Sequence, residues 1–273
     1  MKTKSLLIGC ILISTTSFSQ SFSGLKFSSP QLLNPALTGL VDDKEINVKA
    51  FHQYKTNSLF GSYAFKSDKL HGSLGFYVDT RHTNFENFKS DRSVIGVSYA
   101  FQNTINDKWN YSLGVSVEAG GAGGYAENTS VRQFDYGIKT GGVIYNSNFF
   151  TSLSLDYKNI SAYQVSLISG YTFTPIKNTD FNITPSIGIV NSFGVTQLMV
   201  NIETNYKSVH LGYGNINGRS NVSIGLDFNK FRINYSLGAL KSFGYDTKYG
   251  INEISFKYKI NPKTKKRINL NLF

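Results

Sequence analysis

Apolar residues alternate with small or polar ones along most of the chain after residue 44. In the run from Trp109 to Glu118, Trp, Tyr, Leu and Val interleave with Asn, Ser, Gly and Glu. The same period of two returns over 70–79, 222–228 and 253–260. Because successive side chains of a β-strand point to opposite faces, each run predicts a strand with one apolar and one polar face.

The length of these runs separates two fold classes. A soluble β-sandwich also alternates, but its strands usually contain about five or six residues, whereas a tilted strand that crosses a bilayer needs about 9–11. The runs have the longer length, and in lipid every backbone group must be paired, so the sheet must close on itself. We therefore predict an all-β fold, a transmembrane antiparallel outer-membrane β-barrel of about 14 strands, with its apolar face toward lipid and its polar face toward the lumen.

The pattern also predicts where the strands lie. We expect strands near 44–53, 57–66, 70–80, 93–102, 109–119, 133–145, 149–158, 162–174, 181–192, 195–205, 207–215, 221–229, 231–241 and 249–260. With the N-terminus in the periplasm, the even-numbered connections face the periplasm and should be short. The two longest connections, 81–92 and 120–132, are then expected to be loops outside the cell.

Aromatic residues support this orientation because Tyr, Trp and Phe collect at membrane interfaces. Eleven of them border the connections assigned to the periplasm: Phe65, Phe101, Trp109, Tyr145, Phe149, Phe173, Phe181, Tyr206, Phe228, Phe231 and Tyr258. Strand propensity alone explains their presence in strands but explains this placement less well.

The first residues have the three-part pattern of a secretory signal: Lys2 and Lys4, an apolar run, and a polar stretch with small residues before Gln20. We expect residues 1–19 to be removed. The stretch around Cys10 also fits a lipoprotein box, although the apolar run continues beyond it. Cys10 is the only cysteine, so the mature chain holds neither disulfides nor thiolate metal sites.

The net charge of the chain limits the kinds of partner that we expect it to bind. Without Lys2 and Lys4, the 28 Lys and Arg residues fall to 26 against 17 Asp and Glu, a net charge near +9. This excess suits loops that face anionic outer-membrane lipid or acidic partners. The basic extension 261–273, which contains a Lys and Arg cluster, either is solvated or recruits such a partner. No clustered arginine face is visible in this exported chain, so we do not expect nucleic acid to bind.

No pattern in the sequence indicates catalysis, a metal site or a cofactor. The four histidines, His52, His71, His82 and His210, never occur at the spacing of a metal site. His71 and Ser73 resemble part of a hydrolase pair, but no third orienting group accompanies them, and two polar residues on a wet face are the simpler interpretation. We therefore expect a protein that is not an enzyme.

A glycine-rich stretch contains Gly120, Gly121, Gly123 and Gly124. It lacks the Lys-Ser/Thr and the strand-turn-helix context of a phosphate-binding loop. We expect a mobile surface loop there, which is a candidate for partner binding.

A second candidate is the sequence QLLNPALTGL at residues 31–40. Pro35 removes an amide donor and keeps Asn34 extended, while Gly39 can adopt a positive φ, so the segment predicts a fixed bend with Ala36 inside it. Its leucines require burial, which a segment free in the periplasm would not provide. We expect residues 20–43 to be a lead-in or plug that packs against the periplasmic opening of the barrel, which itself spans residues 44–260.

On these residues the chain resembles the PorP/SprF family of type IX secretion system membrane proteins of the Bacteroidota. The mark of the family, Asn-Pro-Ala shortly followed by Gly, is present as Asn34, Pro35, Ala36 and Gly39. Further family-like phrases are HGSLGFYVD (71–79), SYAFQ (98–102), YSLGVSVEAG (111–120), FDYGIKTGGVIYNSNFFTSLSLDY (134–157) and NEISFKYKI (252–260). The basic extension after residue 260 departs from this pattern.

The resemblance implies an outer-membrane component of type IX secretion and gliding that binds and anchors an exported adhesin-type protein through the C-terminal domain of that cargo. It also implies contact with other components of the secretion system. From the residues alone, a passive diffusion channel remains the alternative.

Overall fold

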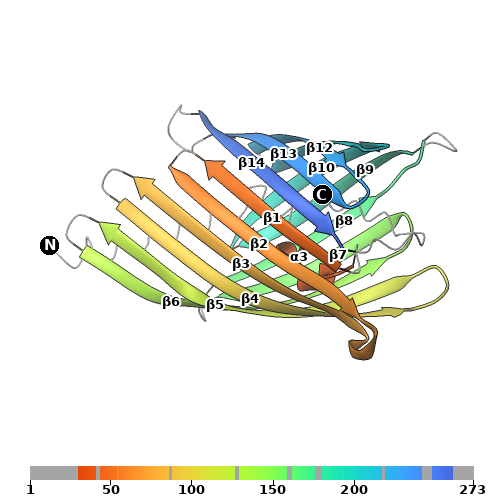
Figure 1. Cartoon of the computed structure of the whole chain (residues 1–273), viewed down its shortest axis with the longest axis horizontal. Helices are drawn as coiled ribbons and strands as arrows, with labels where there is room; N and C mark the ends of the chain where they lie inside the picture. Colours follow the sequence, from red (N-terminus) through yellow and green to blue (C-terminus); the bar gives the residue numbers. More distant parts are fainter. Residues whose placement is uncertain are drawn as a thin grey trace.

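The computed structural model describes residues 30–40, 44–53, 55–85, 88–126, 129–158, 162–175, 180–192, 194–216, 219–241 and 248–260. Fourteen antiparallel strands form a closed barrel in which sequence neighbours pair and the last strand pairs with the first (Figure 1). The predicted fold class is confirmed. The predicted signal 1–19 with Cys10 and the basic extension 261–273 lie outside the described residues.

The strands have these bounds: β1 Lys44–Gln53, β2 Thr56–Ser67, β3 Gly72–Phe85, β4 Phe88–Thr104, β5 Asn110–Ala126, β6 Thr129–Tyr145, β7 Phe149–Lys158, β8 Ala162–Tyr171, β9 Phe181–Ser192, β10 Val195–Tyr206, β11 Val209–Ile216, β12 Arg219–Asp227, β13 Phe231–Lys241 and β14 Lys248–Lys259. Three short helical turns accompany them: α3 Pro30–Leu33, η2 Pro35–Leu37 and η3 Asp68–Leu70. None of the helices among the described residues is long and apolar enough to cross a membrane.

The two faces of the wall follow the alternation of the sequence. On β5, Leu113 points outward with 55% of its surface exposed, whereas its neighbour Ser112 points inward and has no exposed surface. The same contrast holds at Val222, Ile224 and Leu226 of β12, which are exposed on the outer face. The apolar outer face is the one that lipid covers in such a barrel.

The expectation of two outer loops at 81–92 and 120–132 was wrong. Residues 81–92 and 120–132 are mostly strand, because β3 runs to Phe85, β4 starts at Phe88, β5 runs to Ala126 and β6 starts at Thr129. Pairing of β4 with β5 and of β5 with β6 continues to their ends, which satisfies the backbone and outweighs the weak strand propensity of glycine.

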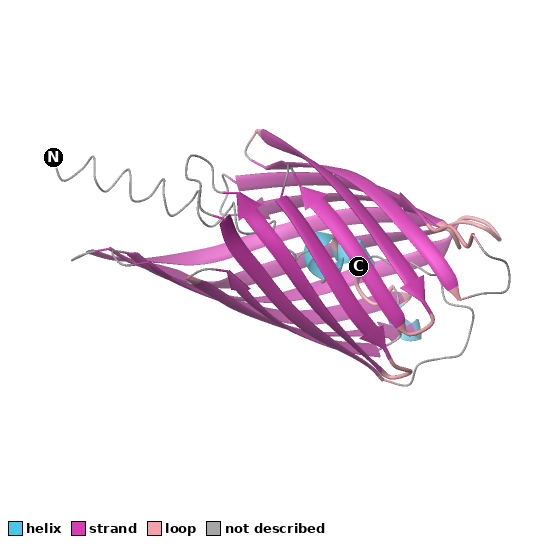
Figure 2. Cartoon of the chain, turned by 90° about the horizontal axis from the view of Figure 1, so that it is seen from above, coloured by secondary structure: helices cyan, strands magenta, loops and turns pink. Residues whose placement is uncertain are grey.

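The strands β4, β5 and β6 contain 17 residues each. A tilted strand crosses the bilayer with about 11, so about six residues of each strand are in excess, or about 20 Å at about 3.3 Å per residue. Figure 2 shows one part of the wall projecting beyond the rest. We call the ends of β5 and β6, residues 120–126 and 129–135, the external extension.

The opposite end carries the predicted aromatic belt, and we call it the periplasmic end after the predicted orientation. Outward rings meet there in pairs, including Trp109 with Phe149 at 5.9 Å and Phe228 with Phe231 at 4.5 Å between ring centroids. Tyr145 is an exception, since its side chain is buried in a cluster inside the barrel rather than in the belt.

Candidate functional site

Residues 30–40 lie inside the barrel, where the helical turns α3 and η2 are seen through the wall in Figure 2. Ten of these residues, 31–40, are buried or half-buried, and η2 contacts β4, β5 and β6. We call residues 30–40 the luminal segment. It occupies the periplasmic half of the interior, since its partners on β5 are near the start of that strand.

Asn34 fixes the luminal segment to the wall. Its side chain has no exposed surface, and its amide nitrogen donates to Ser152 Oγ at 2.8 Å and to the carbonyl oxygens of Leu153 at 3.0 Å and Gly142 at 3.3 Å. Its Oδ1 accepts from the Ala36 backbone nitrogen at 2.9 Å, which caps η2. Asn34 is extended (φ −149°, ψ 120°), and Pro35 occupies the first position of the turn, as the sequence predicted.

The wall beneath the segment is built from glycine where the backbones meet. A Cβ added at Gly141 would lie 2.6 Å from Asn34 Cγ, and one added at Gly114 would lie 2.6 Å from Ala36 Cα. Neither position has room for a side chain while the luminal segment is in place. These two glycines therefore belong to the site, although the sequence analysis did not single them out.

Hydroxyl groups on neighbouring strands bind the backbone of the segment. Ser112 Oγ donates to the Ala36 carbonyl oxygen at 2.6 Å, and Ser154 Oγ donates to the Leu33 carbonyl oxygen at 3.0 Å. The Thr38 hydroxyl donates to Ser98 Oγ at 3.0 Å. The face that the sequence predicted to be wet is, at this depth, occupied by protein.

Gly39 has the positive φ that its position predicted, +60°. A Cβ there would lie 2.6 Å from Ser73 Cβ, so space and conformation both require glycine. Ser73 Oγ lies 3.5 Å from the Gly39 carbonyl oxygen, and Gln102 Nε2 donates to the Thr38 carbonyl oxygen at 3.3 Å. These contacts hold the end of the segment where it turns toward β1.

Apolar contacts of the segment reach two sides of the barrel. Leu33, Ala36 and Leu37 are buried in one cluster with inward side chains of β6, β7, β8 and β10, namely Val143, Tyr145, Phe150, Ile168 and Met199. Leu32 packs on a second cluster from β1, β2, β3 and β14, namely Phe51, Phe60, Tyr77 and Ile251. The luminal segment thus bridges the interior from wall to wall. These inward apolar residues depart from the predicted polar lumen, and their contacts with the segment explain why.

A charged layer lies next to the segment on the external side. Glu118 accepts from Lys139 Nζ at 2.8 Å and pairs with Lys158 at 3.0 Å and Arg92 at 3.5 Å. Arg92 also pairs with Asp135 at 2.5 Å and Asp79 at 3.3 Å. Opposite charges are thus matched within this buried group, as burial requires. Sequence alternation placed Glu118 on the polar face, but it assigned Arg92 to an expected outer loop and did not reveal which residues pair.

The structure places the four predicted glycines away from the luminal segment, within β5. Gly120 and Gly124 share the inward face, and a Cβ at Gly120 would lie 2.7 Å from Val94 Cα. Gly121 has open space around it and Gly123 nearly so. The glycines thus form part of the external extension. The close approach of the β4 backbone explains why glycine is needed at position 120, but it does not explain the other three glycines.

The histidines are not gathered into a metal site, since among the described residues no group of three His, Cys, Asp or Glu is placed to hold a metal ion. His71 caps η3 with a positive φ of 48° and an exposed side chain. Ser73 is buried beside Gly39 and Gln102. The two side chains therefore have different surroundings.

Neither a protein-family model nor a curated protein sequence matches this chain. Solved structures do match in fold. The outer membrane protein Omp33 of Acinetobacter baumannii aligns with a TM-score of 0.52 at 12% identity, covering 82% of this chain and 100% of its own. A FadL homologue of Pseudomonas aeruginosa aligns with a TM-score of 0.51 at 9% identity, covering 85% and 94%.

These likenesses concern the fold. Together with the closed barrel and its apolar outer wall, they define the class: the chain is an outer-membrane β-barrel. Its location is the outer membrane of a Gram-negative bacterium.

Proposed function

We propose that this barrel is a component of a type IX secretion and gliding machinery that binds and anchors an exported adhesin-type protein at the cell surface. The family named in the proposal comes from the resemblance at Asn34, Pro35, Ala36 and Gly39 and in the ordered phrases that follow them. The partner is the C-terminal domain of the cargo, and other components of the secretion system complete the assembly.

One observation carries the proposal: the luminal segment crosses the interior and contacts both walls. An open diffusion channel does not require a segment that is held across its interior by the hydrogen-bonded side chain of an asparagine. A protein that holds a partner at its external face, in contrast, benefits from a rigid and closed interior. We infer that the segment serves this purpose.

The external extension is the surface we assign to the cargo. It projects beyond the span that lipid covers, and it presents the exposed ring of Tyr125 and the exposed Arg132 on its outer face. Aromatic and arginine side chains are the residue types that dominate the energy of protein interfaces. Gly121 and Gly123 leave backbone between them accessible to a partner.

Photo-crosslinking in the native outer membrane tests this assignment. A photoreactive residue at Tyr125 should capture a large surface protein through its C-terminal domain. The matched control is Ile187 of β9, which is also exposed and points outward within the apolar band, and it should capture lipid only. Absence of a protein adduct at Tyr125, in cells that secrete normally, would remove the external extension from the proposal.

A passive diffusion channel is the second candidate, and one observation favours it. Many inward residues of β11, β12 and β13 are small or uncharged and half-buried, including Gly212, Gly214, Ser223, Asn234 and Ser236, while the inward Asp227 and Arg232 pair with each other at 2.6 Å. The small side chains among these fill less of the interior than the large apolar side chains that contact the luminal segment. Conductance before and after removal of the segment distinguishes the two candidates, as described in the Discussion.

A further inference from the structure

The outer wall carries an unbroken row of polar side chains near its external end. Register pairs Asp91 of β4 with His82 of β3, His82 with Asn57 of β2, Asn57 with His52 of β1, and His52 with Asn252 of β14. His52 Nδ1 donates a hydrogen bond to Asn57 Oδ1 at 2.7 Å, and His82 pairs with Asp91. We call these five residues the outer polar row.

The row is polar, whereas many other outward side chains of the wall are aromatic or aliphatic. Exposed tyrosines face outward on other strands, namely Tyr136, Tyr157, Tyr163, Tyr213 and Tyr235. Aromatic girdles are usual at both interfaces of such barrels. The five positions of the outer polar row carry no Phe, Tyr or Trp, so a polar group is expected to meet the wall there.

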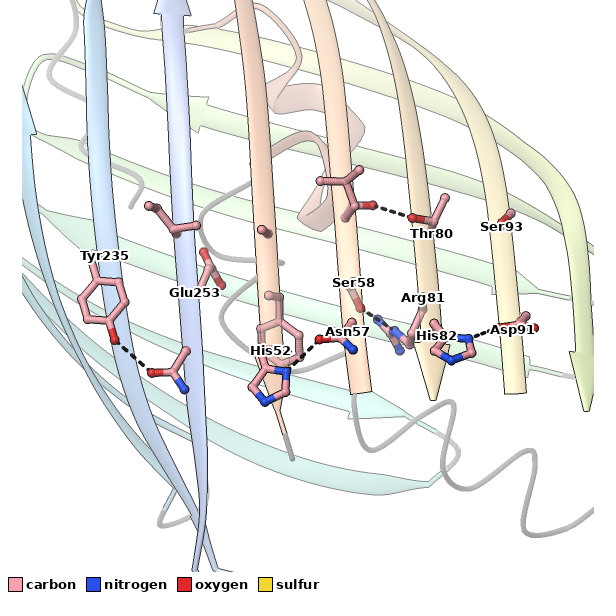
Figure 3. Close-up of a pocket in the computed structure, with 15 residues that line it drawn as sticks. His52, Asn57, Ser58, Thr80, Arg81, His82, Asp91, Ser93, Tyr235 and Glu253 are labelled. Carbon is pink, nitrogen blue, oxygen red and sulfur yellow. Dashed lines mark hydrogen bonds and ion pairs between the residues drawn. The ribbon is translucent and has the colours of Figure 1, made fainter. Parts of the chain in front are cut away.

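A cavity of about 530 Å³ opens on the wall at this place (Figure 3). Its apolar floor comes from the next positions toward the periplasm, Ala50, Leu59 and Ile254, of which the two larger side chains are each 53% exposed. Tyr235 borders it and donates to Asn252 Oδ1 at 2.9 Å. The cavity therefore has an apolar part that faces the acyl chains and a polar part that faces the headgroups.

The polar part has unused hydrogen-bonding capacity. In the described part of the chain, the second ring nitrogen of His52 and the amide nitrogens of Asn57 and Asn252 hold no hydrogen bond. The row contains neither Lys nor Arg, and the Arg81 side chain points into the barrel, where its Nε donates to Ser58 Oγ at 3.3 Å. With a carboxylate at Asp91, this set suits hydroxyl and acylamide groups better than phosphate.

We propose that the outer polar row binds the sugar headgroup of an outer-leaflet glycolipid, whose first acyl chain lies on Ala50, Leu59 and Ile254. The sugar hydroxyl and acylamide groups bind His52, Asn57 and Asn252, and the His82–Asp91 pair closes the far side. The site is separate from the external extension and from the luminal segment, and it stands whether the barrel anchors a protein or conducts solutes.

Native mass spectrometry of the purified full-length barrel tests the proposal with lipid A, dephosphorylated lipid A and phosphatidylethanolamine as probes. We expect both forms of lipid A to be retained in preference to phosphatidylethanolamine. The double variant His52→Leu/Asn57→Leu should lose about tenfold or more in retention, because two hydrogen-bonding side chains at about 1 kcal/mol each are removed. Both changes make the lipid-facing wall more apolar, so insertion is preserved.

The matched control is Asn191→Leu/Thr196→Leu, which removes another outward, hydrogen-bonded cross-strand pair at the external ends of β9 and β10. This control should retain lipid A as the unmodified barrel does. Three results would each overturn the proposal: equal retention of phosphatidylethanolamine, equal retention of lipid A by the His52/Asn57 variant, or retention of the phosphorylated form alone.

Discussion

Asn34 Nδ2 and Ser152 Oγ lie 2.8 Å apart inside the barrel, although 118 positions separate the two residues in sequence. This hydrogen bond connects the luminal segment to β7, a strand in the middle of the chain. Because Nδ2 also contacts the carbonyl oxygens of Gly142 and Leu153 and Oδ1 accepts from the Ala36 backbone nitrogen, the orientation of the Asn34 side chain is fixed. The position of the segment therefore depends on this asparagine.

Asn34→Asp should release the luminal segment. A carboxylate cannot donate to the carbonyl oxygens of Leu153 and Gly142, and unsatisfied buried groups cost about 1–3 kcal/mol each. The reporter is Thr38→Cys, since Thr38 is buried and the predicted mature chain has no other cysteine. Maleimide should label the reporter slowly in the parent and rapidly with Asn34→Asp. Asn103→Asp, at an exposed position, is the control, and equal labelling in all three would contradict the role of Asn34.

Gly141→Ala and Gly121→Ala should differ sharply although the chemical change is the same. The added Cβ at Gly141 collides with Asn34, whereas the one at Gly121 meets open space. We expect Gly141→Ala to increase labelling of the Thr38→Cys reporter and to leave barrel insertion intact, as judged by heat-modifiable mobility. Unchanged labelling would mean that the barrel wall shifts to accommodate the added Cβ while the luminal segment stays in place.

Leu113→Asp and Ser112→Asp should affect different properties, namely insertion of the barrel and burial of the luminal segment. A charge on the lipid face costs up to about 2–4 kcal/mol near the bilayer midplane, so Leu113→Asp should impair insertion. Ser112 faces inward beneath the Ala36 carbonyl oxygen, so Ser112→Asp should insert but expose the Thr38→Cys reporter. Equal heat-modifiable fractions for both variants would refute the assigned faces of β5.

Glu118→Gln should lower the thermal stability of the folded barrel. Glu118 neutralises Lys139, Lys158 and Arg92, and breaking a buried ion pair typically costs about 3–5 kcal/mol. The temperature at which heat-modifiable mobility is lost should fall. Asp107→Asn, in the exposed β4–β5 connection, should leave it unchanged. If both variants match the parent, the charged layer does not stabilise the barrel.

Alternation predicted most of the architecture because a strand exposed to lipid on one face has little freedom in its residues. The bounds expected for β1, β7, β9 and β13 agree with the structure, and other ends differ by a few residues. The largest errors concern β3, β4, β5 and β6, whose ends within 81–92 and 120–132 were interpreted as loops, and only the part in β5 is rich in glycine. Pairing on both sides keeps those strands extended, and pairing partners cannot be read from one strand alone.

The luminal segment was predictable in part. A fixed bend was predicted from Asn34, Pro35 and Gly39, and burial was predicted from the leucines around them. The sequence did not predict that Gly114 and Gly141 would provide the space or that Ser112 and Ser154 would bind the backbone of the segment. On a lumen face, glycine and serine are expected whether they meet water or protein, so their identity alone does not distinguish the two.

The central claim is that the luminal segment restricts the bore of an anchoring barrel. Planar-bilayer conductance of the full-length barrel and of a variant lacking residues 30–40 tests it most directly, with Gly121→Ala as a control. We predict a small conductance for the full-length barrel and for the control, and a conductance several-fold larger for the deletion variant, whose strands are all retained. An equally large, steady conductance from the full-length barrel and the deletion variant would contradict the claim and favour a passive channel.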